Sequence, residues 1–523
     1  MNKEDLANQL EQLADLMGLA GENPFKIRAY EKAKDVILRQ IKEEDLPAIA
    51  DGKIKVAGIG EGIRGAIKEY LETGKLKALD EYQVKIPAAI LALTQLPGLG
   101  AKKAKEIYEN LGVQTLGELE YACKENRLVS LKGFGEATQQ KLLKSLERMK
   151  QNQGKYLISD AVESTLGLEK DLSHDWQVTP IGELGRKSDI VSHFDFAVYG
   201  ASSKDLEKLE KKYAAQGFHF QSIAKPFEKL EMQEQQLLMA SPKVKDHIKS
   251  SGPLKTKEGE WEFSWLEDEN LKRKPTARTY RRKTHGSVKG IFHNHTTASD
   301  GSASLEEMVK AAEKEGYEYI GISDHSETAV YAGGLKTDTL LEQNEEIQKL
   351  QKKVKIKIFH GVESDILQDG ALDYPESVLK KLDFVVGSIH SRFQMDEKTM
   401  TERLCKALEN PYITFWGHPT GRLLLGRDPY AFDWKKVLTA AKKNDVIIEL
   451  NSNPQRLDVD WRRGELLQEM QIPICINPDA HAVDGLKDTM WGEFMAEKAM
   501  VDADLVFNLK SAKEVQEYFK KRR

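Results

Sequence analysis

The chain contains 523 residues, of which 40% are hydrophobic and 31% charged, and its formal net charge at pH 7 is −5. Such a composition is typical of folded domains with buried cores, and the length corresponds to roughly three or four domains. A mainly disordered chain is excluded, and so is a basic coat over the whole protein, so any nucleic-acid binding must be local. Three isolated cysteines exclude both a disulfide framework and a cysteine zinc finger.

The first residues are acidic and lack the apolar segment of a secretory signal. No apolar run approaches the ~18 residues of a membrane span. We therefore expect a protein of the reducing cytoplasm that does not bind membranes. Nothing in the sequence requires more than a monomer.

Residues 1–85 are predicted to be helical, because apolar residues such as Ile27 and Ile37 recur at the spacing of one helix face. Three similar turns then interrupt the helical pattern. Their sequences are VAGIGEG at 56–62, LPGLGAK at 96–102 and LKGFGEA at 131–137. In each turn an apolar residue and a spacer precede a Gly-x-Gly pair, and a helix bearing Lys or Arg follows.

These turns are typical of helix-hairpin-helix elements, which bring backbone N–H groups close to a phosphate. Glycine allows the close approach, and the N-terminus of the following helix favours an anion. Such contacts hold the nucleic-acid backbone and carry no sequence information. The alternative is that the turns are plain connections, as most single Gly-x-Gly sequences are. The predicted contacts with DNA phosphates are Gly58, Gly60, Gly98, Gly100, Lys102, Lys103, Gly133 and Gly135.

Residues 156–270 have a mixed pattern. The segment HFDFAVYG at 193–200 alternates like a strand, residues 204–217 are predicted to form a helix, and EGEWEFSWLEDEN at 258–270 is predicted to form a strand. Residues 271–285 then contain seven Lys or Arg side chains and no acidic one. A proline lies inside this run, so we expect a linker or an extended arm.

From residue 286 onward, short apolar runs alternate with helical segments. The seven runs are GIFHNH, YIGISDH, IKIFHGVE, FVVGSIH, ITFWGH, VIIELNSN and ICINPDAH. Alternation of β and α predicts a parallel sheet or barrel, whose active site lies at the carboxyl ends of the strands. Polar residues fall at these ends, or just beyond them in the case of Asp300: His293, His295, Asp300, His325, Glu363, His390, His418, Asp479 and His481.

Imidazole and carboxylate together suit Zn, Mn or Fe. Six histidines and three carboxylates exceed the needs of one tetrahedral zinc, so the pattern indicates a multinuclear centre. Such centres activate water and hold the oxygens of a phosphoryl group, which is the chemistry of phosphoester hydrolysis. The alternative is that these are core or surface histidines in chance proximity, which is how we interpret His360.

The motifs HNHTTASDG, GISDH, GVES, GSIHSRF, GHPTGR and NPDAH resemble the polymerase-and-histidinol-phosphatase (PHP) phosphoesterase family over about residues 288–515. The resemblance implies a distorted seven-stranded βα barrel with three divalent metals, Mn²⁺ or Zn²⁺. It implies that His293, His295, Glu363 and Asp479 hold the first metal. Glu363 would bridge the first metal to a second metal.

By the same resemblance, His390 and His418 complete the second metal site. Asp300, His325 and His481 hold the third. Glu363 is thereby assigned a catalytic role, and so are Arg422 and Arg427 as phosphate clamps, because a planar guanidinium pairs well with phosphate. A salt bridge at the barrel rim is the alternative for the two arginines.

The order of all these segments resembles the bacterial X-family DNA polymerases (PolX) over nearly the whole chain. In that family the C-terminal PHP domain is a manganese-dependent 3′→5′ exonuclease. The resemblance implies a multidomain protein with a helical N-terminus, a degenerate α+β palm and a C-terminal α/β barrel. The expected domains are a lyase-like helical domain at 1–85, a fingers-like helix-hairpin-helix pair at 86–155, a palm/thumb-like region at 156–270, a basic linker at 271–287 and the PHP domain at 288–523.

The palm departs from the family pattern. The palm of an active polymerase needs a Gly-Ser pair, which holds the triphosphate. It also needs an Asp-x-Asp strand, which holds two Mg²⁺ ions. In GELGRKSDIVSHFDF, Glu183 follows Gly182, and His193 stands where the first Asp of the pair with Asp195 belongs. Asp189 is nearby but out of phase. We therefore predict that polymerase activity is lost.

The sequence thus predicts a PolX-like repair protein whose PHP domain degrades DNA from a 3′ end, with DNA as its partner. Three alternatives stay open at this point. They are a small-molecule phosphatase of the histidinol-phosphate type, a DNA-binding scaffold with a structural metal cluster, and an active X-family polymerase that also has exonuclease activity.

Overall fold

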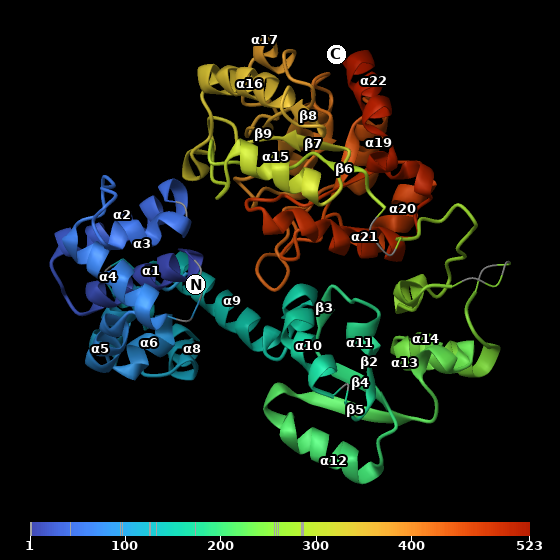
Figure 1. Cartoon of the computed structure of the whole chain (residues 1–523), viewed down its shortest axis with the longest axis horizontal. Helices are drawn as coiled ribbons and strands as arrows, with labels where there is room; N and C mark the ends of the chain where they lie inside the picture. Colours follow the sequence, from blue (N-terminus) through green and yellow to red (C-terminus); the bar gives the residue numbers. More distant parts are fainter. Residues whose placement is uncertain are drawn as a thin grey trace. The chain divides into compact units, whose positions relative to one another are not determined.

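The computed structural model describes residues 3–41, 43–94, 96, 98–124, 127–131, 133–172, 174–255, 257, 259, 261–283 and 287–523. The chain divides into two compact units, Met1–Gln153 and Gly154–Arg523, which are coloured from blue to teal and from teal to red in Figure 1. Pro97 and Lys132 of the glycine turns and residues 284–286 of the predicted linker lie outside the described residues.

The first unit is helical, as its sequence predicts. Its helices are α1 (Lys3–Leu19), α2 (Pro24–Gln40), α3 (Leu46–Ala50), α4 (Glu61–Thr73), α5 (Lys77–Lys85), α6 (Ala88–Thr94), α7 (Ala101–Leu111), α8 (Leu116–Lys124) and α9 (Glu136–Asn152). One apolar core joins them, and α4 shows why: Ile63, Ile67 and Tyr70 recur on one face and are buried. None of the described helices of the chain combines the length and hydropathy needed to cross a bilayer.

The second unit begins with a small α+β region. Its elements are β1 (Tyr156–Leu157), α10 (Ile158–Leu172), β2 (Gln177–Ile181), α11 (Gly182–Gly185), β3 (Ile190–Val191), β4 (Phe194–Tyr199), α12 (Ser203–Lys212), β5 (Phe218–Ile223), α13 (Met232–Met239) and α14 (Pro242–Ser251). Strand β4 lies between antiparallel β2 and parallel β5. The predicted strand at 193–200 and the predicted helix at 204–217 are therefore confirmed as β4 and α12.

The prediction of a strand at 258–270 is wrong. The described part of this segment forms two short 3₁₀ turns, at Phe263–Trp265 and Asp268–Asn270. Its polar groups are satisfied by a helix rather than by a neighbouring strand. Ser264 donates to the Glu497 carboxylate, and the Trp265 indole N–H donates to the Glu497 carbonyl. Docking against α21 (Thr489–Lys498) thus overrides the alternating pattern.

The basic segment that follows packs on the barrel as an extended arm. Tyr280 is buried, and its hydroxyl donates to Glu493 over 3.0 Å. Arg278 forms an ion pair with Asp502 at 2.7 Å, and Thr279 makes a β-bridge to the same residue. Of the two sequence-based alternatives, linker or arm, the described residues 271–283 are an arm.

The rest of the second unit is a parallel β/α barrel. Its strands are β6 (Gly290–Ile291), β7 (Tyr319–Ile322), β8 (Lys357–His360), β9 (Glu363–Asp365), β10 (Val386–Ser388), β11 (Phe415–Trp416), β12 (Ile447–Asn451) and β13 (Ile474–Asn477). They pair in the orders β6-β7-β8 and β9-β10-β11-β12-β13. All seven predicted runs are present, and β8 and β9 are two halves of one run that is broken at Gly361.

Two isolated bridges close the barrel where the regular ladders stop. His325 pairs with Glu363 between β7 and β9, and Asn294 pairs with Ala480 between β6 and β13. The helices after the strands are α15 (Leu305–Lys314), α16 (Thr337–Gln351), α17 (Glu376–Leu379), α18 (Glu397–Leu408), α19 (Trp434–Lys443), α20 (Gly464–Glu469), α21 and α22 (Ala512–Arg522). Closure brings strand ends that are far apart in sequence to one rim.

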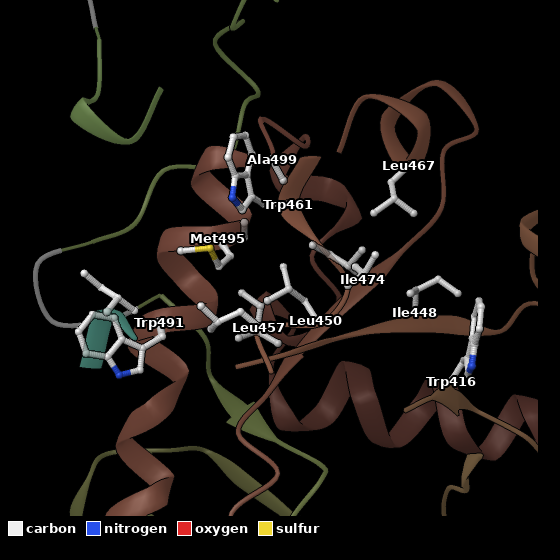
Figure 2. Close-up of a cluster of buried hydrophobic side chains, with 14 of the residues drawn as sticks. Trp416, Ile448, Leu450, Leu457, Trp461, Leu467, Ile474, Trp491, Met495 and Ala499 are labelled. Atoms are coloured by element: carbon white, nitrogen blue, oxygen red, sulfur yellow. The ribbon is translucent and has the colours of Figure 1, made fainter. Parts of the chain in front are cut away.

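Two clusters of buried apolar side chains hold the strand ends of this rim in place. Phenylalanines from several strands pack together inside the barrel and against Phe519 of α22; they include Phe292, Phe359, Phe384 and Phe415. Figure 2 shows part of the second cluster, in which Leu457 and Trp461 lie near Met495 and Ala499. The loop after β12 is thereby tied to the barrel core.

We expect Tyr280→Ala to lower the free energy of unfolding of the second unit by about 3–5 kcal/mol, because a buried aromatic ring is removed. Tyr280→Phe should cost only about 1 kcal/mol, since it removes one hydrogen bond. All seven tryptophans lie beyond residue 175, so urea unfolding of the intact chain followed by tryptophan fluorescence reports this unit. Equal midpoints for wild type and Tyr280→Ala would mean that the arm is not docked.

Candidate functional site

The nine residues predicted as metal ligands converge at the carboxyl ends of the barrel strands. Glu363, completely buried at the start of β9, is their centre. Its Oε1 lies 2.9 Å from His418 Nε2, 3.2 Å from His390 Nε2 and 3.3 Å from His293 Nε2. Its Oε2 lies 2.8 Å from His325 Nδ1 and 3.7 Å from His295 Nε2. One carboxylate therefore faces five imidazoles.

A second carboxylate, Asp479, faces the histidines of the first strand. Asp479 Oδ1 lies 3.2 Å from His295 Nε2 and 3.5 Å from His293 Nε2. His293, His295 and Asp479 are close enough to hold one cation, and so are His293, Glu363 and His418. His418 thus groups with His293, a predicted ligand of the first metal, although His418 itself is predicted to hold the second.

Asp300 forms the third group with three stacked imidazoles. Its carboxylate oxygens lie 3.4 Å from His481 Nε2, 3.5 Å from His325 Nε2 and 3.8 Å from His295 Nδ1. The ring of His295 stacks between those of His325 and His481, with centroid separations of 4.4 and 4.1 Å. His295 therefore has one nitrogen toward Asp300 and the other toward Asp479, and it connects two groups.

The donor set fits cations. Within the described part of the chain, several buried nitrogen and oxygen atoms at the centre, all of them able to bind a metal, make no hydrogen bond. They include His293 Nε2, both ring nitrogens of His295, and Glu363 Oε2. Buried polar atoms normally have partners, so such a cluster needs an explanation, and a bound cation supplies one. His418 and Asp479 also have positive φ angles, 23° and 53°, a backbone strain that is typical of functional sites. His360 lies outside these groups.

Two carboxylates that sequence reasoning missed orient the histidines from behind. Glu449 accepts from His293 Nδ1 at 2.7 Å and from the His418 backbone N–H at 2.9 Å. Asp365 lies 2.6 Å from His390 Nδ1. A carboxylate on the far nitrogen fixes the ring so that the other nitrogen faces a metal. A signal existed: Glu449 is an acidic residue inside the apolar run VIIELNSN.

Burial and charge set the ionisation of the cluster. Burial opposes a charge on His293, but Glu449, Asp479 and Glu363 outweigh it and raise its pKa. Burial and two neighbouring imidazoles lower the pKa of His295 to about 3. Burial would raise the pKa of Glu363, and the surrounding histidines instead hold it well below its usual range. The centre therefore combines ionised carboxylates with a neutral imidazole at His295, which is a donor set for a cation.

The two arginines predicted as phosphate clamps have other partners. Arg422 donates to the carbonyls of Arg456 and Leu457 and forms an ion pair with Asp460, so it holds the loop after β12. This matches the alternative, a salt bridge at the rim. Arg427 donates to the Gly421 carbonyl and stacks on Phe393.

Arg456, which sequence reasoning missed, contacts a residue of the cluster directly. Its Nε lies 3.3 Å from Asp479 Oδ2, and its buried Nη1 makes no hydrogen bond to any described residue. A guanidinium in this position suits a phosphate oxygen.

In the first unit, the three glycine turns share one geometry. The first glycine of each pair, Gly58, Gly98 or Gly133, has a φ between 84° and 95°, which side chains rarely adopt. The second glycine of each pair is the N-cap of the next helix, α4, α7 or α9, and has no side-chain cap. A Cβ at this second glycine would meet no described atom within 4 Å. Each helix N-terminus is therefore open to an anion.

The two lysines predicted at the second turn differ. Lys102 is exposed in the first turn of α7. Lys103 is half-buried, and its ammonium lies 5.6 Å from the ring centre of Phe134 in the third turn. Lys102 is thus the better placed for a phosphate, and Lys103 links two turns.

The palm-like sheet has a single acidic residue. Of its three described strands, β4 carries Asp195, while β2 and β5 carry no carboxylate. Glu183 accepts from the backbone N–H groups of Ser192 and His193, which stabilises the turn before β4. Asp189 is buried and forms a two-pronged ion pair with Arg462, at 3.0 and 3.2 Å.

These features define a PHP phosphoesterase-type barrel joined to helix-hairpin-helix modules. Residues 292–453 match the PHP domain family, residues 1–76 a helix-hairpin-helix domain family, and residues 90–148 the family of SAM-like helix-hairpin-helix tandems. The chain is 32% identical over 573 aligned positions to a Bacillus subtilis protein named DNA polymerase/3′-5′ exonuclease PolX, with both proteins covered completely. The chain therefore belongs to the PolX family.

The barrel also has smaller relatives. A probable phosphatase of Thermoanaerobacter sp. is 30% identical over 252 residues, which cover 44% of this chain and 94% of the relative. A probable phosphatase of Acetivibrio thermocellus is 35% identical over 166 residues, which cover 31% and 64%. Similarity to phosphatases is thus confined to part of the chain, whereas similarity to PolX extends over all of it.

Glu449→Gln should weaken Mn²⁺ binding by roughly 10- to 100-fold, because the far nitrogen of His293 loses its anionic partner. Glu409→Gln, at an exposed position, is the control. Titration of metal-free protein with Mn²⁺ measures the affinity. An affinity equal to that of the control would show that Glu449 does not orient a ligand.

Proposed function

We propose that the chain is a DNA-repair 3′→5′ exonuclease whose PHP barrel hydrolyses the phosphodiester at a DNA 3′ end. The observation that carries the proposal is the buried ring of histidines and carboxylates around Glu363, with unpartnered donor atoms at its centre. The name of the B. subtilis relative, a polymerase and 3′-5′ exonuclease, supports DNA rather than a small molecule as the substrate. Action on DNA also agrees with the cytoplasmic location that the sequence predicts.

We assign up to three divalent metals, Mn²⁺ or Zn²⁺, to the cluster. His293, His295 and Asp479 would hold the first, His390 and His418 the second, and Asp300, His325 and His481 the third, with Glu363 shared. Bound metals of this kind lower the pKa of water and hold phosphoryl oxygens. Glu363 would neutralise part of the charge of the cations, and Arg456 would offer a guanidinium to the phosphate. Glu449 and Asp365 keep the imidazoles in position.

The first unit would hold the DNA backbone. Three glycine turns with the same open helix N-terminus provide backbone N–H groups for phosphates, and Lys102 adds a charge. This contact is not sequence-specific, so the enzyme would recognise DNA shape and ends.

His390→Ala should lower the rate of Mn²⁺-dependent degradation of 3′-ended DNA by orders of magnitude while the barrel stays folded, because a donor facing Glu363 is removed. His219→Ala, an exposed histidine of β5, should leave the rate unchanged. Chelation should abolish the activity of wild type. Near-normal activity and metal content of His390→Ala would refute the ligand assignment.

Lys102→Gln should weaken binding to gapped DNA and make its salt dependence shallower by about one unit in the log–log slope, as expected for one lost phosphate contact. Lys124→Gln, exposed at the end of α8, is the matched control. Fluorescence anisotropy at several salt concentrations measures both quantities. An unchanged slope would contradict the assignment of this turn to DNA.

We also propose that the palm-like region does not polymerise. Two carboxylates facing one point are needed for two Mg²⁺ ions, and an imidazole such as that of His193 is a poor ligand for this hard ion, which prefers oxygen. Asp189, which lies nearby in the sequence, is engaged by Arg462. In addition, the alignment with the B. subtilis relative spans 573 positions, so it includes positions that this 523-residue chain does not fill.

No template-directed extension of a gapped duplex is expected from His293→Ala, a variant in which degradation cannot mask synthesis. The assay is primer extension with Mg²⁺ and with Mn²⁺. Incorporation that disappears on adding Asp195→Asn would show that the palm is active and would restore the active-polymerase alternative.

The second candidate is a small-molecule phosphatase, which the probable phosphatases related to the barrel favour. Comparing histidinol phosphate with 3′-ended DNA as substrates decides between the two. We expect DNA to be the better substrate, because the glycine turns have no role in the alternative.

A further inference from the structure

The palm-like region contacts the barrel through a carboxylate that the PolX resemblance leaves without a role. Asp189, just before β3, is buried, yet the charge of Arg462 outweighs the effect of burial and lowers its pKa to about 2. The two side chains form two parallel hydrogen bonds, from Nη1 to Oδ2 at 3.0 Å and from Nη2 to Oδ1 at 3.2 Å. This two-pronged geometry fixes the position of the guanidinium as well as neutralising the carboxylate.

Arg462 belongs to the loop of residues 452–463, which follows β12, and the ionic contacts continue along that loop. Arg462 Nη1 lies 3.2 Å from Asp460 Oδ1, and the other oxygen of Asp460 binds Arg422. Arg422 in turn donates to the carbonyls of Arg456 and Leu457. Each contact is made by a side chain with few alternative positions, because Arg422 is buried and Asp460 also caps the turn at 461–463.

The contacts end at the metal cluster. Arg456 lies 3.3 Å from Asp479, and its unpartnered Nη1 is the guanidinium nitrogen that we assign to the phosphate. The apolar side of the same loop is fixed by Leu457 and Trp461, both buried in the cluster of Figure 2. The loop is therefore held on its apolar side by the barrel and on its polar side by the palm-like region.

A second contact reinforces the first. Glu267 lies 3.1 Å from Arg186 Nε, accepts from Ser188 and pairs with the fully buried Lys498. Lys498 also lies 5.3 Å from the Trp461 ring centre. The segment 186–189 is thus tied to both the loop and α21.

We propose that Asp189 is a positioning residue for phosphodiester hydrolysis: the palm-like region, without polymerase chemistry, holds the loop 452–463 so that Arg456 meets the phosphate. The inference rests on the proposed phosphoesterase function and adds a role for a region that this function otherwise leaves unused. The competing explanation is that the ion pair only stabilises the contact between the two parts of the unit.

The test uses the full-length protein, Mn²⁺ and bis(p-nitrophenyl) phosphate, a small diester whose hydrolysis does not depend on the glycine turns. Asp189→Asn preserves shape and leaves no charge buried alone, so the fold should survive. Asp189→Glu keeps the charge and serves as the conservative variant. Arg278→Gln breaks another ion pair on the barrel, at Asp502, that does not involve the loop.

We expect Asp189→Asn to lower kcat roughly 10- to 100-fold, the effect of a misplaced catalytic group, with unchanged metal content. Asp189→Glu should recover part of the loss, and Arg278→Gln should keep the wild-type kcat even where its melting temperature falls equally. A wild-type kcat for Asp189→Asn, or a loss that follows metal content or melting temperature in all variants, would overturn the inference. If wild type itself did not hydrolyse the diester, the proposed function would fail instead.

Discussion

The second unit depends on one constraint: the carboxylate of Glu363 is buried where five imidazoles meet. An isolated carboxylate there would be strongly destabilising, and it is tolerated because histidines surround it and their positions suit cations. These imidazoles come from strand ends between residues 293 and 418, so only a closed barrel can assemble them. Barrel closure through Asn294–Ala480 and His325–Glu363 is therefore a condition of the site as well as of the fold.

The first unit repeats one kind of turn three times and does not depend on a buried cluster of charged groups. Three turns with a left-handed glycine, a buried apolar residue and an uncapped helix N-terminus occur within residues 56–137. If backbone N–H groups bind the phosphates, as we propose, the unit does not need a strongly basic composition. This agrees with the net charge of −5 for the whole chain.

The palm-like region contributes ionic contacts to the rest of the second unit. Its sheet keeps the order β2-β4-β5, yet Asp195 is the one carboxylate on these described strands. The neighbouring carboxylates serve the structure: Glu183 holds the turn before β4, and Asp189 holds Arg462. Under the proposed function, this region would act through its contact with the barrel rather than through nucleotide transfer.

The sequence by itself determined the class of each region and the candidate ligands, because strand ends and glycine turns are local patterns. It predicted all seven barrel runs and the nine residues that converge. Tertiary structure decided what depends on distant partners. The segment 258–270 turns instead of extending because α21 satisfies its polar groups. Arg422 is engaged by a loop more than thirty residues away, whereas Arg456, without any motif, lies beside Asp479. Glu449 left one local signal, an acidic residue inside an apolar run, but its partner His293 and the role of Asp365 became visible only when barrel closure placed both carboxylates behind the histidines.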